Sequence, residues 1–201
     1  MDRYTELDTV RDRVWQRMER AADDSRAPFR ILTFGTVQGD RPQLRSVVLR
    51  GAAREARRLS FHSDRRAEKI DDIRAHDRIA WHGWDPDTSE QIRLWGTATV
   101  HTDDAVADEM WAAEDPSALA LYPKSPAPGT PLDAPDDGLP ASGAEEPITR
   151  ADVADGRQYF AVVRTVIDAF DWLHLHPEGH YRARFRLDSG QEAFEGRWIV
   201  P

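Results

Sequence analysis

The segment Gln43-Leu44-Arg45-Ser46-Val47-Val48-Leu49-Arg50 is typical of a β-strand and carries an arginine among apolar residues. Strand side chains alternate between two faces, so we expect Arg45 on the same face as Val47 and Leu49. A guanidinium on an apolar face needs a partner, and its parallel N–H donors suit a phosphate. Arg45 is therefore a candidate anion-binding residue.

A second segment, Phe61-His62-Ser63-Asp64-Arg65-Arg66-Ala67-Glu68-Lys69, is predicted to be a strand end that leads into a helix start. Its Ser63 hydroxyl, its helix N–H groups and the cations Arg66 and Lys69 all favour an anion. A capped surface helix with solvated cations explains the same residues. Together the two segments predict a cradle for a phosphorylated cofactor, and no glycine-rich phosphate loop competes with them.

The composition limits the classes of protein that the chain can represent. It has 201 residues, of which 40% are hydrophobic, which is enough for one domain with a core. The net charge of −9 disfavours binding to nucleic acid or to anionic lipid. The absence of cysteine excludes disulfides, zinc–thiolate sites and cysteine nucleophiles. The charged N-terminus and the lack of a long apolar run lead us to expect a cytoplasmic protein.

Strand signals joined by short turns dominate the chain, with few helices between them. This pattern predicts an α+β protein, mainly β, built as a six-stranded antiparallel split barrel in a single domain over residues 1–201. Residues 123–148 hold seven of the thirteen prolines and are expected to form a long loop. We expect helices over 5–22, 66–75 and 104–113, and strands over 29–37, 41–51, 59–63, 78–84, 91–101, 159–169, 171–176, 180–187 and 194–200.

Five further residues, in three groups, carry possible binding chemistry. The amide of Gln91 both donates and accepts hydrogen bonds, which suits the edge of a heterocycle, although an ordinary half-solvated strand explains it too. Arg182, Arg184 and Arg186 form a basic stripe that indicates either a nearby anion or a solvated edge strand. Trp172 is the tryptophan that we expect beside a flat ring.

The sequence gives little evidence for a metal site or for a catalytic nucleophile. His174 and His176 share a strand face, but no third ligand follows at a firm spacing, so no metal site is predicted. No nucleophile elbow is present, and no catalytic acid or base stands out.

The order of these segments resembles the pyridoxamine 5′-phosphate oxidase-like superfamily of FMN-binding split barrels, in a divergent branch. The resemblance rests on Arg45–Arg50, Phe61–Asp64, Lys69 and Gln91–Gly96, and more weakly on Trp172 with Arg182–Phe185. It implies a homodimer with FMN at the subunit interface. The residues that it implies for FMN are Arg45, Ser46, Val47, Val48, His62, Ser63, Arg66, Lys69, Gln91 (from the partner subunit), Trp172 and Arg184.

The substrate half of the site departs from the pattern of that superfamily. Arg50, Trp111 and Arg182 stand at positions that the resemblance assigns to substrate. Asp115, before Pro116, stands where the oxidase carries an arginine for the substrate phosphate, and an acid there repels a phosphate.

The sequence therefore predicts an FMN-binding protein that acts as a flavin-dependent oxidoreductase, with an unidentified substrate and electron donor. Four alternatives stay open: a non-catalytic flavin- or ligand-binding module, a true pyridoxamine or pyridoxine 5′-phosphate oxidase, a haem-binding relative, and a colourless lipocalin-like barrel.

Overall fold

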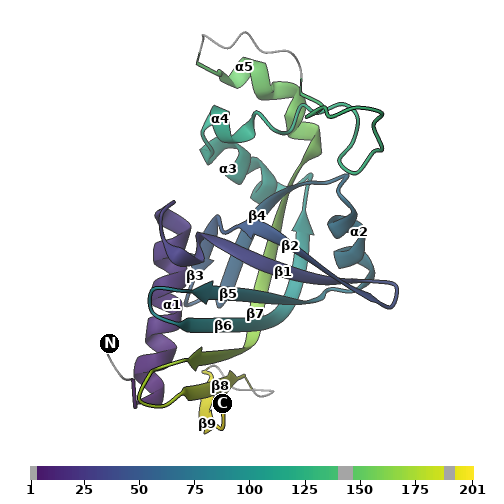
Figure 1. Ribbon diagram of the computed structural model, residues 1–201. Coiled ribbons are helices and arrows are strands. Elements are labelled where there is room, and N and C mark those ends of the chain that lie inside the picture. The colour runs from purple at the N-terminus through teal and green to yellow at the C-terminus, as the bar shows by residue number, and fades with distance from the viewer. Residues whose placement is uncertain (1–3, 140–146, 188–192) are drawn as a thin grey trace.

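A nine-stranded antiparallel sheet forms the centre of the computed structural model, which describes residues 4–139, 147–187 and 193–201 (Figure 1). The strand order is β2-β1-β5-β6-β7-β4-β3, with β8 paired to both β7 and β9. The strands are β1 (Ile31–Gln38), β2 (Arg41–Val48), β3 (Gly51–Ala53), β4 (Arg58–Asp64), β5 (Arg78–Asp85), β6 (Glu90–His101), β7 (Phe160–His174), β8 (Tyr181–Arg186) and β9 (Glu195–Ile199). The α-helices are α1 (Leu7–Asp23), α2 (Glu68–Ala75), α3 (Ala105–Ala113), α4 (Pro116–Leu119) and α5 (Arg150–Val153), and the 3-10 helices span Pro28–Arg30 and Ala154–Tyr159.

The barrel closes where β2 runs into β3. These two strands stand at opposite ends of the strand order but are separated in the chain only by Leu49 and Arg50. The N–H of Leu49 donates to the carbonyl of Arg30, and the N–H of Arg50 donates to the carbonyl of Ser60, both at 2.8 Å. The α+β class and the antiparallel split barrel are thus confirmed. The sheet has nine strands rather than six because β3, β8 and β9 extend the other six.

The interior of the barrel is built on aromatic rings. Phe34, Phe61 and Trp81 contact one another edge to face, with ring centroids 4.8–5.5 Å apart. Helix α1 covers one side of the barrel with a buried apolar face, as its spacing predicts (Figure 1). Arg17 of α1 pairs with the buried carboxylates of Asp85 and Glu90 and so ties the helix to β5 and β6.

The hairpin of β1 and β2 sets the position of Arg45. Gln38 pairs with Arg41 across the turn, and Arg45 lies opposite Phe34 in the register. Val47 is 8% exposed and Leu49 is fully buried, whereas Ser46 and Val48 are exposed. Arg45 therefore lies on the inward face with Val47 and Leu49, as the alternation predicts.

The prediction of two strands over 159–169 and 171–176 is wrong, because β7 runs unbroken for 15 residues. A bulge between Trp95 and Gly96 shifts the register of the β6–β7 pair and allows the long strand to continue. A Cβ atom at Gly96 would lie 2.1 Å from the carbonyl oxygen of Val166, so only glycine fits there. The strand can then pair with β4 along its first part and with β8 along its second.

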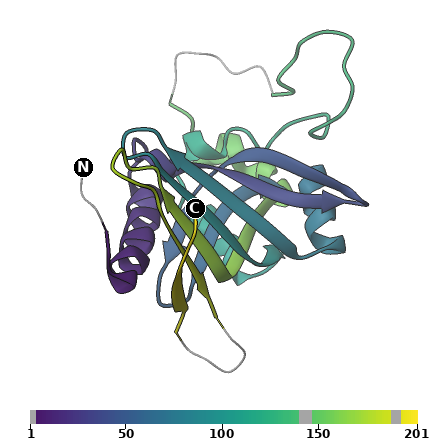
Figure 2. The same ribbon diagram turned by 60° about the horizontal axis from the view of Figure 1, so that its bottom comes forward.

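Helices α3, α4 and α5 gather at one end of the molecule (Figure 1). They enclose a second apolar cluster, made of Ala107, Leu119, Tyr122, Val153, Phe160 and Val162. The Asp104 carboxylate accepts from the N–H of Ala107 at 3.0 Å and caps α3, as predicted. Residues 123–139 contain no helix or strand (Figure 2), whereas 140–146 of the expected loop lie outside the described residues. Among the described helices, none combines the length and apolar character that crossing a membrane requires.

Candidate functional site

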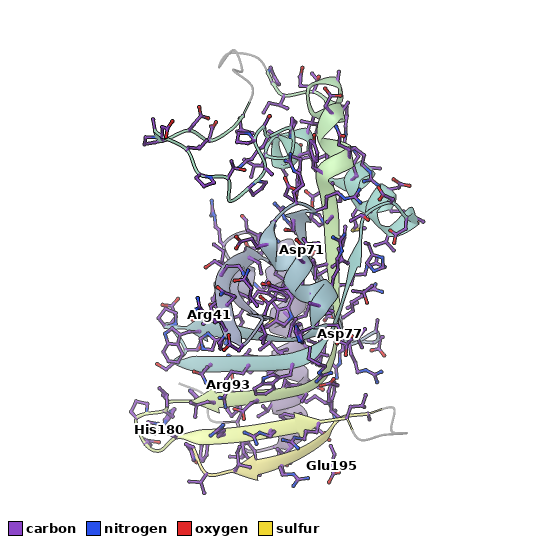
Figure 3. The ribbon with its side chains drawn as sticks, turned by 90° about the vertical axis from the view of Figure 1, so that its right-hand side faces the viewer. Arg41, Asp71, Asp77, Arg93, His180 and Glu195 are labelled. Atoms are coloured by element: carbon purple, nitrogen blue, oxygen red, sulfur yellow. The ribbon has the colours of Figure 1, made fainter. Side chains whose placement is uncertain are left out.

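Two cations and a hydroxyl meet at one end of the barrel. Arg45 comes from β2, Ser63 from the end of β4, and Lys69 from the first turn of α2, the helix marked by Asp71 in Figure 3. The ammonium of Lys69 donates to the Ser63 hydroxyl at 3.2 Å. Arg45 lies near enough for its charge to act on Lys69. We call Arg45, Ser63 and Lys69 the cradle.

The cradle holds more positive than negative charge. Burial lowers the pKa of Lys69 from its ordinary value, and the charge of Arg45 lowers it further, while Asp64 and Asp72 oppose the shift. Arg45 donates to Asp72 at 3.3 Å and to the Thr36 hydroxyl at 2.6 Å, and Thr36 in turn donates to Asp72. Asp72 is thus the carboxylate that directly pairs with a cradle cation. A bound anion would relieve the repulsion between the two cations.

Arg66 does not join this group. It makes two hydrogen bonds to the Asp64 carboxylate, at 2.7 and 3.0 Å, and one to the carbonyl of Lys124 at 3.1 Å. Its guanidinium also stacks on the ring of Tyr159, 3.5 Å from the centroid. Arg66 thus ties the start of α2 to the loop after α4 and pairs with Asp64, and its contact with a phosphate stays a prediction.

A second polar group lies between the barrel and the helical end. Nη1 of Arg50 is 3.7 Å from one carboxylate oxygen of Glu114, and Nδ1 of His62 is 3.4 Å from the other. We call Arg50, His62 and Glu114 the Glu114 cluster. Burial, followed by the charge of Arg50, lowers the pKa of His62 to about 4, so its ring is neutral at pH 7.

Aromatic rings pack beside His62 on the side of the helices. Phe160 contacts His62, Trp111 and Tyr122 edge to face, with centroids 4.9–5.2 Å apart. Burial raises the pKa of Tyr122, so its phenol stays protonated. Trp111, which the resemblance places at the substrate, contacts Phe160, and Phe160 also contacts His62. Sequence reasoning missed Glu114 and Tyr122, because no local motif marks residues that reach the strands only through the fold.

A third group lies on the outward face of the sheet, where Arg93 is labelled in Figure 3. The register places Gln91 and Arg93 of β6, Asp171 of β7, and Arg184 of β8 on this face. Asp171 is fully buried and accepts hydrogen bonds from Arg182 and Arg184, while Arg93 lies 3.1 Å away. Burial opposes the ionisation of Asp171, but these contacts keep its pKa below the ordinary value. Asp171 therefore holds three arginines in place.

The outward face and the cradle are not brought together within one chain. Arg45 and Ser63 lie on the inward face, whereas Gln91, Arg182 and Arg184 point outward with Ser46 and Val48. The ring of His82 lies 3.3 Å from the amide oxygen of Gln91. Beside Arg184, a shallow hollow of about 580 Å³ is lined by Arg78, Trp95, Asp168, Ala169, Arg184, Arg186 and Leu187.

Trp172 does not take the place that we expected beside a flat ring. Its side chain is fully buried on the inward face, opposite Ile92, and its indole N–H donates to Glu90 at 3.3 Å. The alternation of β7 therefore separates it from Asp171 and Arg184. In residues 4–139, 147–187 and 193–201, no three His, Asp or Glu side chains are grouped to hold a metal ion.

The sequence matches a known family over part of its length. Residues 12–102 match the family described as pyridoxamine 5′-phosphate oxidase, FMN-binding domain. The matched segment includes the cradle, Arg50, His62 and Gln91, but it ends before Trp111, Glu114 and the arginines of β8. No curated protein sequence matches the chain.

Solved structures share the fold over nearly the whole chain. A pyridoxamine 5′-phosphate oxidase-related FMN-binding protein from Nostoc punctiforme has 24% identity and a TM-score of 0.71, and the match covers 95% of this chain and 96% of that one. PhzG from Burkholderia lata, solved with tetrahydrophenazine-1-carboxylic acid, has 17% identity and a TM-score of 0.70, covering 100% of this chain and 95% of that one. The chain thus resembles the pyridoxamine 5′-phosphate oxidase-like FMN-binding split barrels, in sequence over residues 12–102 and in fold along nearly its entire length.

Proposed function

We propose that this protein binds FMN through the cradle and acts as a flavin-dependent oxidoreductase. The observation that carries the proposal is the meeting of Arg45, Ser63 and Lys69, two cations and a hydroxyl, at one end of the barrel. The family matched by residues 12–102 is an FMN-binding domain, and its segment contains all three residues. We retain the single domain and the cytoplasmic location as predictions.

The donors of the cradle suit the phosphate of FMN. Arg45 and Lys69 balance its charge, and the Ser63 hydroxyl donates to a phosphate oxygen. Asp72 and Thr36 hold the guanidinium of Arg45 in place. Bound FMN would supply the capacity to accept a hydride or to pass single electrons.

A homodimer is part of the proposal. The outward face of β1, β2 and β5 exposes apolar side chains beside Gln91: Ile31 is 61% exposed, Leu44 72%, Val48 39% and Trp84 42%. Apolar side chains grouped on one face favour contact with another protein surface, and two copies can pair through the same face. A second copy that pairs through this face would bring its own Gln91 and Arg184, which lie on the same face, towards the outward side chains of β2, Ser46 and Val48.

The test is the absorption spectrum of the purified protein, with mass spectrometry of the chromophore that heating releases. We expect bound FMN, and its loss in the Arg45→Gln and Lys69→Gln variants. Lys124→Gln is the matched control, because Lys124 lies outside the cradle. Purified protein that is colourless and does not bind added FMN would refute the proposal, and a Soret band would indicate the haem alternative.

Two further measurements test the rest of the proposal. Sedimentation of the native chain and of Leu44→Glu tests the dimer, because a carboxylate on the exposed face should separate the copies. Reduction of the bound flavin by NADH or NADPH tests the oxidoreductase activity. A flavin that neither donor reduces would favour the non-catalytic binding module.

A further inference from the structure

We propose that the shallow hollow beside Arg184 binds a small molecule that carries an anionic group on a flat ring. We call it the arginine hollow, because three of its seven lining residues are arginines. Its volume of about 580 Å³ falls within the range of small-molecule sites, about 300–1,000 Å³. The inference goes beyond the proposed function, since this hollow lies on the outward face of the sheet, whereas Arg45 and Ser63 of the cradle lie on the inward face.

Short side chains around Trp95 leave space beside its ring. Trp95 lies two residues after Arg93 on β6 and therefore on the same outward face. Its cross-strand neighbours are alanines on both sides, Ala80 on β5 and Ala169 on β7. The methyl groups of these alanines do not fill the space next to a partly exposed indole, and Trp95 and Ala169 both line the hollow. A flat ring can pack against the indole there and bury apolar surface.

The arginine hollow has an excess of positive charge. Its lining contains three arginines and one acid, Asp168, whose carboxylate accepts from Nη2 of Arg78 at 3.1 Å. The described charged side chains next to this lining, by contact or by register, are Asp77, Arg93, Asp171, Arg182, Glu195 and Arg197. Together with the lining they amount to six arginines and four acids, an excess of two positive charges. Because the whole chain has a net charge of −9, this local excess favours an anion here.

The arginines on β8 are placed to serve an anionic ligand. Nε and Nη2 of Arg184 both donate to Oδ2 of the buried Asp171 at 3.1 Å. The side chain of Arg184 is nevertheless 32% exposed and lines the hollow, so it is a fixed donor that a ligand can reach. Arg186 is exposed and lies opposite Glu195 in the register. A carboxylate or a phosphate would meet guanidinium groups that are already in place, which lowers the cost of ordering them.

The test compares 2-naphthoate with 2-naphthamide, two probes that share a flat ring and differ in charge, by calorimetry at low salt. We expect the FMN-loaded native protein to bind the naphthoate about tenfold more tightly or better. Arg186→Gln should raise the dissociation constant of the naphthoate by about threefold to tenfold and leave that of the naphthamide unchanged. Trp95→Leu should weaken both probes by a similar factor, because it removes the ring that both contact. Arg20→Gln, at a 74% exposed arginine of α1, is the matched control and should bind both probes like the native protein.

The same titrations without flavin separate the arginine hollow from the flavin site. Because the resemblance implies Arg184 for FMN, the substitutions are made at Arg186 and Trp95 instead. We expect the naphthoate to bind with and without FMN, and the flavin content of Arg186→Gln to stay native. Naphthoate binding by a protein that does not take up FMN would refute the proposed function and leave the arginine hollow standing.

Three results would overturn the arginine hollow. The first is a native protein that binds the two probes equally or binds neither. The second is an Arg186→Gln variant that keeps the native affinity for the naphthoate. The third is displacement of the naphthoate by FMN, which would assign the hollow to the flavin itself.

Discussion

The cradle and the Glu114 cluster use similar residues but differ in how their charges are paired. In the cradle, Arg45 and Lys69 lie close together and Asp72 is the carboxylate in direct contact with them. In the Glu114 cluster, the carboxylate of Glu114 lies between Arg50 and His62, and the imidazole of His62 is neutral at pH 7. The first region is therefore suited to an anion, whereas the second already holds a carboxylate between its cation and its imidazole. The number of cations in the sequence does not reveal this difference, because the carboxylates that pair with them come from other elements.

The largest expected effect concerns the counter-charge of the cradle. Asp72→Ala removes a carboxylate that is 4% exposed and leaves Arg45 and Thr36 without their acceptor. We expect the free energy of unfolding to fall by about 3 kcal/mol, as measured by urea denaturation. Asp71→Ala, one residue earlier on α2 and 79% exposed, should change it by less than about 0.5 kcal/mol. Equal losses in the two variants would contradict the pairing of Arg45 with Asp72.

The neutral imidazole of His62 in the Glu114 cluster predicts a pH dependence of stability. His62 has a pKa of about 4 in the folded chain, against about 6.5 when unfolded. The unfolded chain then binds a proton that the folded chain does not, so stability falls as the pH drops from about 6.5 towards 4. The loss should reach about 3 kcal/mol, from the pKa difference at about 1.4 kcal/mol per unit. Urea denaturation across this range should show a smaller loss for His62→Gln, and parallel curves would exclude the effect.

The next prediction tests the positive charge of the cradle. Lys69→Gln should raise the dissociation constant of FMN by about tenfold to a hundredfold. The reason is the loss of one charge-assisted hydrogen bond to the phosphate, which contributes about 2 kcal/mol. Flavin fluorescence measures the constant, and Lys124→Gln should keep the native value. The same substitution should not destabilise the flavin-free protein, because it removes a buried ammonium next to Arg45. Unchanged FMN affinity in Lys69→Gln would place the flavin elsewhere.

The smallest expected effect is a change in the pKa of His62, which tests whether the two regions are electrostatically separate. Arg50→Gln should raise the pKa of His62, because the charge of Arg50 is the second cause that lowers it after burial. The chemical shifts of the His62 ring protons, followed against pH by NMR, report this pKa. Lys69→Gln serves as the control, since its charge does not contribute to the shift of His62. A shift of the same size in both variants would mean that the two regions are not electrostatically separate.

Local patterns in the sequence were enough for many of the elements. The alternation around Arg45 predicted its inward face, and Gln38-Gly39-Asp40 predicted the hairpin turn. Asp104 predicted the start of α3. These predictions succeeded because a turn, a cap or an alternating strand depends on neighbours in the chain. The same reasoning wrongly predicted two strands where the structure has the single strand β7. The bulge that allows β7 to continue depends on its contact with Gly96 of β6, and a local pattern does not show that contact.

The sequence alone also determined which charged and polar side chains are available: Arg45, Ser63 and Lys69, which we predict to bind an anion, and Arg50, whose contact with substrate stays a prediction. Only the tertiary structure decided how each charge is used. It paired Arg66 with Asp64, buried Trp172 on the inward face, and brought Glu114 from the end of α3 to Arg50 and His62. The reason is physical: the behaviour of a charge depends on its burial and on the nearest opposite charge, and both come from residues that are distant in the chain.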